Sequence, residues 1–278
     1  MSERDSADVE AAEARAYELL LGATSPETRT RHGIAACAVD GALALVSSGM
    51  TRSMMFNRTI GLMPGMRIDQ AWLDSLTELY AARGVESFAL EIPSCLDVDP
   101  SGLKASRFMP FKRTITMLLT NAKIVGAAHA CPVPKGTVEV RRVGRPEASL
   151  FARLCCAVFS LDSEPFEDFL ESSFAEDRVR HWMAFAGARP VATAMTVHVG
   201  DRFAWIGWVA TIPEFRGMGI QSALARRQIE ACAEEGIERV SLEAAAPTRH
   251  GGGTSLRNYQ RLGWRSVHQR IVYLRRAS

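Results

Sequence analysis

An internal repeat limits what this 278-residue chain can fold into more than any other feature of its sequence. Residues 79–92, LYAARGVESFALEI, align with residues 231–244, ACAEEGIERVSLEA, at a constant offset of 152 positions. In each segment a helical pattern ends at a glycine, Gly84 or Gly236, which adopts the left-handed backbone of a helix end without a Cβ penalty. An alternating strand pattern follows at once. The repeat predicts two related α/β units in tandem.

The repeat extends to the strands that close each unit, because residues 111–120 resemble residues 268–276. Two prolines and a glycine interrupt the patterning at residues 130–136. This interruption predicts a first domain of residues 1–133 and a second of residues 134–278. The alternative is that helix, glycine and strand are a common combination and that the match arose by chance.

The first 25 residues are charged and rich in alanine. They predict a surface helix that ends at Gly22, and nothing in the sequence gives that helix a function.

Composition excludes several classes of function. Apolar residues make up 47% of the chain, which permits a sizeable core. The net charge of +2 and the lack of a Lys/Arg block argue against nucleic acid, and no run of eighteen apolar residues predicts a membrane span. The six cysteines form no CxxC pair, so we expect reduced thiols and a cytoplasmic location. No group of His, Cys or Asp residues has the spacing of a metal site. The possibility that the chain forms a homodimer is left open by the sequence.

A glycine-bearing turn joins a predicted strand at 203–211 to a predicted helix at 219–235. The first N–H groups of such a helix lack intrahelical partners and lie at the positive end of its dipole. Gly217 and Gly219 would let a ligand approach the main chain, and Arg216 adds a positive charge. The turn therefore predicts a pyrophosphate site, and the alternative is a turn that only packs helix against strand.

Other phosphate loops do not fit this turn. No lysine occurs after Lys135, so there is no GxxxxGK[ST] loop, and Ser222 stands where a dinucleotide-binding loop has its third glycine.

At these residues the sequence resembles a known family. Residues 209–224 are similar to the acetyl-CoA-binding motif of the GCN5-related N-acetyltransferases (GNAT), in which a strand leads through Pro-x-aromatic-Arg-Gly-x-Gly into a helix. Residues 137–276 resemble one whole domain of that family, and the first half resembles a degenerate second copy. The resemblance implies two tandem GNAT-like α/β domains, each with a mixed, mostly antiparallel twisted sheet flanked by helices. The sequence departs from the motif at Gln221, where the family usually has Gly or Ala.

The resemblance also implies how acetyl-CoA is held. The backbone of residues 209–211 would pair with the pantetheine arm, and the amides of residues 216–222 would hold the pyrophosphate. The cofactor-binding residues expected on this basis are Val209, Ala210, Thr211, Arg216, Gly217, Met218, Gly219, Ile220, Gln221, Ser222 and Asn258.

The first copy lacks this loop. Its counterpart, Pro64-Gly65-Met66-Arg67-Ile68-Asp69, has a single glycine and an aspartate at the helix start. Asp69 suits a helix N-cap and would repel phosphate, so we expect one cofactor site per chain.

The catalytic groups are less well defined. Tyr259 lies four residues before a Gly-Trp pair, as does the tyrosine that protonates the coenzyme thiolate in the family, so the resemblance assigns it as general acid; the alternative is a core tyrosine. Two candidates for the general base are Glu243 and His198. The counterpart of Glu243 is Glu91, in the half without the loop, which favours a structural role for Glu243. A lone histidine on a strand is also more often structural than catalytic.

Three residues are candidates for lining an acceptor site. His250 precedes three glycines, and Trp205 and Trp208, three positions apart on one strand, should point to opposite faces of it.

The sequence thus predicts an acetyl-CoA-dependent N-acetyltransferase that acts on a primary amine, by family default a small molecule. Two alternatives stay open, a non-catalytic acyl-CoA-binding regulator and an acyltransferase that uses a longer acyl-CoA.

Overall fold

The computed structural model describes residues 2–51, 53–120, 138–161, 164–248 and 252–276. The strands of the first half are β1 (Ile34–Val39), β2 (Ala42–Ser47), β3 (Arg58–Ile60), β4 (Phe88–Pro93) and β5 (Phe108–Thr120). Those of the second half are β6 (Glu139–Val143), β7 (Val179–Ala186), β8 (Arg189–His198), β9 (Phe203–Thr211), β10 (Arg239–Ala245) and β11 (Arg265–Arg275). The α-helices are α1 (Glu3–Ala23), α2 (Pro26–His32), α3 (Gln70–Ala81), α4 (Pro100–Ala105), α6 (Ala148–Phe159), α7 (Glu164–Ser172), α8 (Ile220–Glu234) and α9 (Thr254–Arg261).

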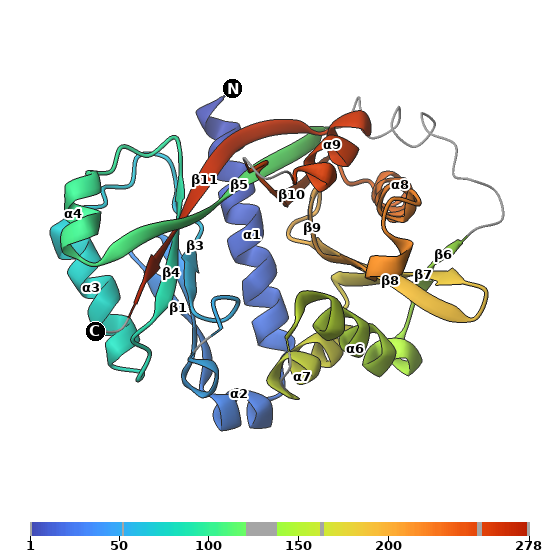
Figure 1. Ribbon diagram of the computed structural model, residues 1–278, viewed down its shortest axis with the longest axis horizontal. Helices are drawn as coiled ribbons and strands as arrows, with labels where there is room; N and C mark the ends of the chain where they lie inside the picture. The colour runs from blue at the N-terminus through green and yellow to red at the C-terminus, as the bar shows by residue number, and fades with distance from the viewer. Residues whose placement is uncertain (1, 52, 121–137, 162–163, 249–251, 277–278) are drawn as a thin grey trace.

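The two halves exchange their closing strands. In the described part of the chain all strands form one sheet, in the order β1-β2-β3-β4-β11-β5-β10-β9-β8-β7-β6. Strand β11 of the second half pairs with β4 of the first, and β5 of the first half pairs with β10 of the second. Figure 1 shows β11 running from the second half into the first, where the chain ends beside α3. Each half of the sheet is therefore completed by the other half of the chain.

The repeat is visible in the fold. In the first half, β3, α3 and β4 form a parallel βαβ unit in which Arg58 pairs with Ala89. In the second half, β9, α8 and β10 form the equivalent unit, also with parallel pairing. Gly84 and Gly236 end the two helical segments at positive φ angles of 70° and 75°, as the sequence predicted. The two tandem α/β units are confirmed, while the expected boundary near residue 133 lies outside the described residues.

The prediction that the first helix lies on the surface was wrong. Helix α1 lies between the two halves (Figure 1), and its residues Ala16 and Leu20 are fully buried. The glutamates that suggested a solvated face, Glu10 and Glu13, are buried too, because they pair with arginines from distant strands. Buried carboxylates are tolerated when they are paired in this way.

Helices cover both faces of the sheet around β9 and β10. Along β9, Ile206 packs with the core beneath α8 and α9, whereas its neighbour Trp205 packs with the core beneath α1, α6 and α7. Alternate residues of a strand point to opposite faces, so these two cores lie on opposite sides of the sheet. No helix in the described residues is long and apolar enough to cross a membrane.

Candidate active site

A cleft opens where β9 and β10 separate. The two strands pair in parallel from Phe203 and Arg239 to Ile206 and Leu242, and the register ends there. Beyond this point β9 continues to Thr211 with only β8 as a partner among the described strands. Its other edge faces a cleft of about 890 Å³ that extends to α8 and α9. A free strand edge offers backbone donors and acceptors to an extended ligand.

A β-bulge lies on β9 at the edge of this cleft. Met195 of β8 pairs with Gly207, and Thr193 pairs with Ala210. Two steps along β8 therefore correspond to three steps along β9, so β9 holds one extra residue. Trp208 takes a positive φ of 53°, a strained value for a non-glycine residue. The bulge reverses the alternation, and Trp205 and Trp208 pack into the same core. The prediction that they point to opposite faces was therefore wrong.

The glycine turn leaves the start of α8 open. Gly217 and Gly219 have φ angles of 80° and 78°, and a Cβ added at either would meet nothing within 4 Å. Gly219 is the N-cap of α8, and it has no side chain that could accept a hydrogen bond from the first turn. The free N–H groups and the helix dipole therefore face open space, which suits an anion.

The structure places the predicted cofactor residues around this one cleft, except Met218, whose side chain is exposed. It adds residues that the sequence did not single out: Val158 and Phe159 at the end of α6, Phe215 in the turn, and Thr254 and Arg261 at α9. Arg261 gives the cleft a second cation beside Arg216. Its position three residues after Asn258, on the same face of a helix, was the available signal.

The unusual Gln221 spans the cleft wall. Its side-chain amide donates to the Ser255 hydroxyl at 2.7 Å, and its carbonyl oxygen accepts from the Asn258 amide at 2.8 Å. The side chain therefore reaches from α8 to α9, so the departure from the family pattern ties the two helices together.

The family assignment comes from residues 148–264, which match the model of the acetyltransferase (GNAT) family. Residues 148–264 form a GNAT domain. Enzymes of this family are acyltransferases that use acetyl-CoA, and they act on an acceptor substrate. No curated protein matches the chain at a significant level.

Solved structures extend the likeness of the fold to both halves. A GCN5-related N-acetyltransferase from Kribbella flavida is 16% identical, with a TM-score of 0.64 over 97% of this chain and 96% of that one. A GCN5-related N-acetyltransferase from Sphaerobacter thermophilus is 18% identical, with a TM-score of 0.58 over 78% and 71% of the two chains. A tandem GNAT protein from the clavulanic acid biosynthesis pathway is 14% identical, with a TM-score of 0.54 over 78% and 74%.

The counterpart of the GNAT loop in the first half is closed by a side chain. Asp69 is the N-cap of α3, and its carboxylate accepts a hydrogen bond from the Trp72 amide at 3.1 Å. Arg67 stands where the second half has Gly219, and it lies 3.3 Å from the same carboxylate. The anion-binding end of α3 is thus occupied by the protein's own aspartate.

Tyr259 lies behind the wall of the GNAT cleft. It is 2% exposed, and its ring packs edge-on against Trp264 with centroids 5.2 Å apart. Burial raises the pKa of its hydroxyl, and a hydrogen bond with Gln221 only partly opposes this. The phenol therefore stays protonated at neutral pH, and Gln221 connects it to the residues that line the cleft.

Glu243 lies at the point where the strands separate. It is the first residue of β10 after the last pair with β9, and it points to the α1 face of the sheet, where its carboxylate accepts from Thr114 at 2.9 Å and pairs with Arg270 at 3.0 Å. Its side chain remains 21% exposed. Burial raises its pKa to about 7, helped by the charges of Glu91 and Glu13 and opposed by Arg270.

The structure does not bring His198 to the cleft. Its ring lies 3.6 Å from the carboxylate of Glu235, which follows the last residue of α8, whereas the loop lies at the first residue of that helix. Burial lowers the pKa of His198. His250, the other candidate histidine, lies outside the described residues.

A buried charge network connects the two repeated glutamates. One nitrogen of Arg270 lies 3.6 Å from Glu91 and 3.0 Å from Glu243, and it also bonds to Glu13 of α1. Arg58 binds the other oxygen of Glu91 at 2.8 Å. Burial raises the pKa of Glu91, but Arg58 and Arg270 outweigh it, so the net shift is downward. The pKa values of the two equivalent glutamates are therefore shifted in opposite directions, because their arginine contacts differ.

Proposed function

We propose that the protein is an acetyl-CoA-dependent N-acetyltransferase that transfers an acetyl group to a primary amine of a small molecule. The observation that carries the proposal is the open start of α8, where two glycines at positive φ leave uncapped amides facing the cleft of a GNAT domain. We assign catalysis to the second half, residues 134–278, and the shaping of the acceptor side to the first, residues 1–133.

The cleft fits the three parts of the coenzyme. The amides from Arg216 to Ser222 would hold the pyrophosphate, with Arg216 and Arg261 as nearby cations. The unpaired edge of β9 at residues 209–211 would pair with the pantetheine arm as an added strand. Bound acetyl-CoA would supply the activated thioester.

The two catalytic roles go to groups with suitable protonation states. Glu243 would accept the proton that the amine loses as its nitrogen forms a bond to the acetyl carbon, because a carboxylate with a pKa of about 7 is half ionised at neutral pH. Tyr259 would donate its proton to the coenzyme sulfur as the carbon–sulfur bond breaks. Return of the proton from Glu243 to Tyr259 through solvent would restore both groups.

Release of free thiol from acetyl-CoA over a panel of amines tests the proposal. We expect amine-dependent thiol release, and Tyr259→Phe should lower kcat about 100-fold or more with little change in acetyl-CoA affinity. Coenzyme binding without thiol release for any amine would refute the enzyme and favour an acyl-CoA-binding regulator. The same assay with propionyl-CoA and butyryl-CoA measures the preferred acyl length.

A further inference from the structure

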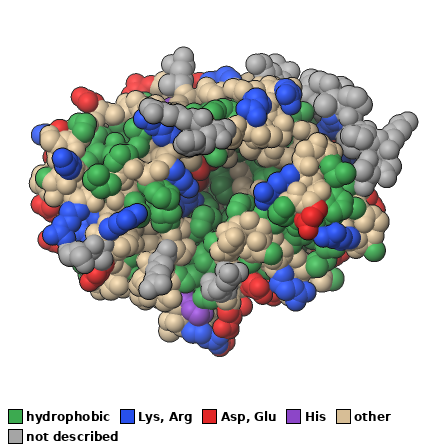
Figure 2. All heavy atoms as spheres, viewed as in Figure 1, with side chains coloured by type: hydrophobic (Ala, Val, Ile, Leu, Met, Phe, Trp, Pro, Cys, Tyr) green, Lys and Arg blue, Asp and Glu red, His purple; other side chains and the backbone are tan. Residues whose placement is uncertain are grey.

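A second cavity lies between the two halves of the chain, next to the coenzyme cleft. Its volume is about 560 Å³, and its wall combines Met50 and Arg58 of the first half with Leu161 and Phe166 of the second. Residues 158 and 159 line the coenzyme cleft, and the next two residues line this cavity, so the end of α6 separates the two spaces. Figure 2 shows a hollow near the middle of this face, with hydrophobic side chains surrounded by charged ones.

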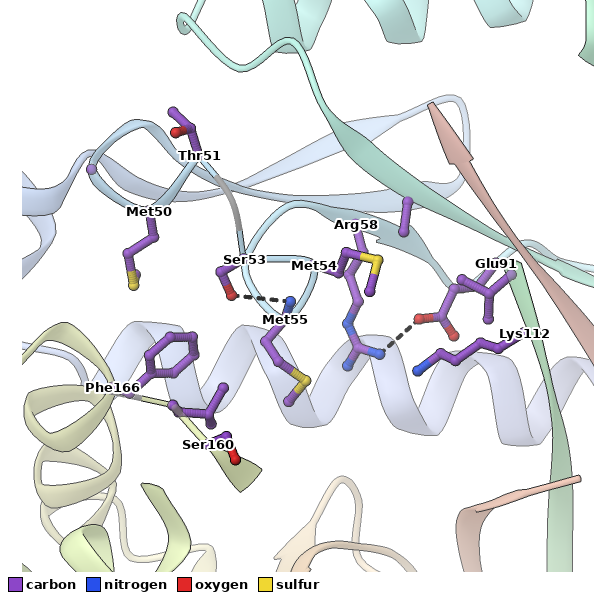
Figure 3. Close-up of a pocket in the computed structure, with 14 residues that line it drawn as sticks. Met50, Thr51, Ser53, Met54, Met55, Arg58, Glu91, Lys112, Ser160 and Phe166 are labelled. Atoms are coloured by element: carbon purple, nitrogen blue, oxygen red, sulfur yellow. Dashed lines mark hydrogen bonds and ion pairs between the residues drawn. The ribbon is translucent and has the colours of Figure 1, made fainter. Parts of the chain in front are cut away.

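Most of the wall is apolar and adaptable. Figure 3 shows Met50, Met54, Met55 and Phe166 around the cavity, with Arg58, Glu91 and Lys112 together at one end. Methionine side chains are flexible and polarisable, so they accommodate apolar groups of varied shape. The cavity therefore suits a ligand with an apolar body.

The charged end of the cavity presents two cations, Arg58 and Lys112, beside the carboxylate of Glu91. Arg58 is paired with Glu91 at 2.8 Å and with Glu13 at 3.5 Å, and its buried Nε has no hydrogen-bond partner among the described residues. Lys112 has no carboxylate within 4.0 Å among the described residues, and its ammonium points into the cavity beside Arg58 (Figure 3). Lys112 thus presents N–H donors to the cavity, and a ligand carboxylate is an acceptor of complementary charge.

The charged end of the cavity lies along β5 from Glu243, the proposed general base. Thr114, which bonds Glu243, follows Lys112 by two residues on the same strand. Residues two apart on a strand share a face and lie about 7 Å apart. A ligand held by Lys112 could therefore extend toward Glu243, and its amine would be drawn there by the carboxylate and repelled by Lys112.

We propose that this cavity binds the acceptor and selects primary amines whose apolar body carries a carboxylate remote from the amine. The inference rests on the proposed acetyl transfer for the identity of the ligand as acceptor, but the carboxylate site itself does not depend on turnover.

The test compares 6-aminohexanoate with hexylamine as acceptors in the thiol-release assay. We expect 6-aminohexanoate to be the better substrate. Lys112→Met should raise its KM roughly tenfold to a hundredfold, the worth of a charge-assisted hydrogen bond, with kcat and the constants for hexylamine unchanged. Lys112→Arg should retain the preference. Lys104→Met, at an exposed lysine outside the cavity, is the matched control.

Direct binding of hexanoate, measured by calorimetry on the intact protein, separates this proposal from the proposed function. Binding that is lost in Lys112→Met but kept in Lys104→Met supports the cavity even if no amine is acetylated. Thiol release that is equal for the two amines and indifferent to Lys112→Met overturns the cavity proposal and leaves the acetyltransferase in place.

Discussion

Each half has one helix between its two parallel strands, α3 in the first half and α8 in the second. These two helices begin in different ways. Helix α3 begins at Asp69, whose carboxylate bonds to the Trp72 amide. Helix α8 begins at Gly219, which offers no side chain, and its first amides stay open. The parallel pairing of the two strands around each helix and the glycine at positive φ that ends each helical segment are the same in both halves.

This difference shows that the fold alone does not make a coenzyme site. Both copies provide a helix N-terminus after a strand, but a carboxylate at the cap satisfies the amides and cancels the positive end of the dipole. In the second copy we propose that the missing side chain leaves the amides free to bind the coenzyme. The repeated glutamates show the same principle, because Glu91 is held by two arginines while Glu243 bonds to one and keeps a pKa of about 7.

The largest effect is expected from removing the carboxylate of the second copy. Glu243→Gln should lower kcat about 100- to 10,000-fold, the usual range for loss of a general base, while acetyl-CoA affinity stays unchanged. Steady-state kinetics and calorimetry measure the two quantities. Glu234→Gln, an exposed glutamate at the end of α8, is the control. Retention of full activity in Glu243→Gln would remove it from the mechanism.

Giving the second copy an acidic cap should abolish most coenzyme binding. In Gly219→Asp the new charge would lie near the pyrophosphate, and two like charges about 4 Å apart repel by about 4 kcal/mol at an effective dielectric constant near 20. We expect acetyl-CoA affinity to fall at least 100-fold by calorimetry. Circular dichroism checks that the variant is folded. Unchanged affinity would show that the anion binds elsewhere.

Alanine substitutions at two equivalent glycines test the same comparison with a smaller change. Gly65 and Gly217 occupy equivalent positions with φ angles of 85° and 80°, and an added Cβ would meet nothing within 4 Å at either. Alanine at each should cost about 1–2 kcal/mol of stability, because both adopt the left-handed region. Only Gly217→Ala should also weaken acetyl-CoA binding, by about tenfold. Equal losses of affinity would contradict a role specific to the second loop.

The smallest expected effect is a shift in pH dependence. Below its pKa of about 7 Glu243 is protonated and cannot accept a proton, so kcat/KM should rise with pH through that value. The charge of Glu91 helps to raise this pKa, so Glu91→Gln should move the rise to lower pH. Glu86→Gln, an exposed neighbour, should not move it. A shift in the opposite direction would exclude Glu243 as the titrating group.

Local patterns predicted much of the second half. The strand expected at 203–211 has the bounds of β9, and helix α8 begins one residue from its predicted start. Apart from Asn258, the residues expected around the coenzyme lie between 209 and 222, so a short continuous motif was enough to find them.

Those local patterns could not predict contacts between residues that lie far apart in the sequence. Glu13 looked solvated because its arginine partners lie 45 and 257 positions away. The exchange of β5 and β11 leaves both strands with ordinary strand sequences, and only the pairing reveals it. The bulge at Trp208 adds one residue directly after Gly207, a glycine inside a strand that was the available signal, so simple alternation predicted the wrong face.

Calorimetric titration of the intact protein with acetyl-CoA tests the central claim most directly. If only the uncapped helix binds the coenzyme, the stoichiometry should be one molecule per chain, and Gly219→Asp should remove that binding while Gly65→Asp leaves it intact. Two sites of similar affinity, or one site lost in Gly65→Asp and kept in Gly219→Asp, would contradict it.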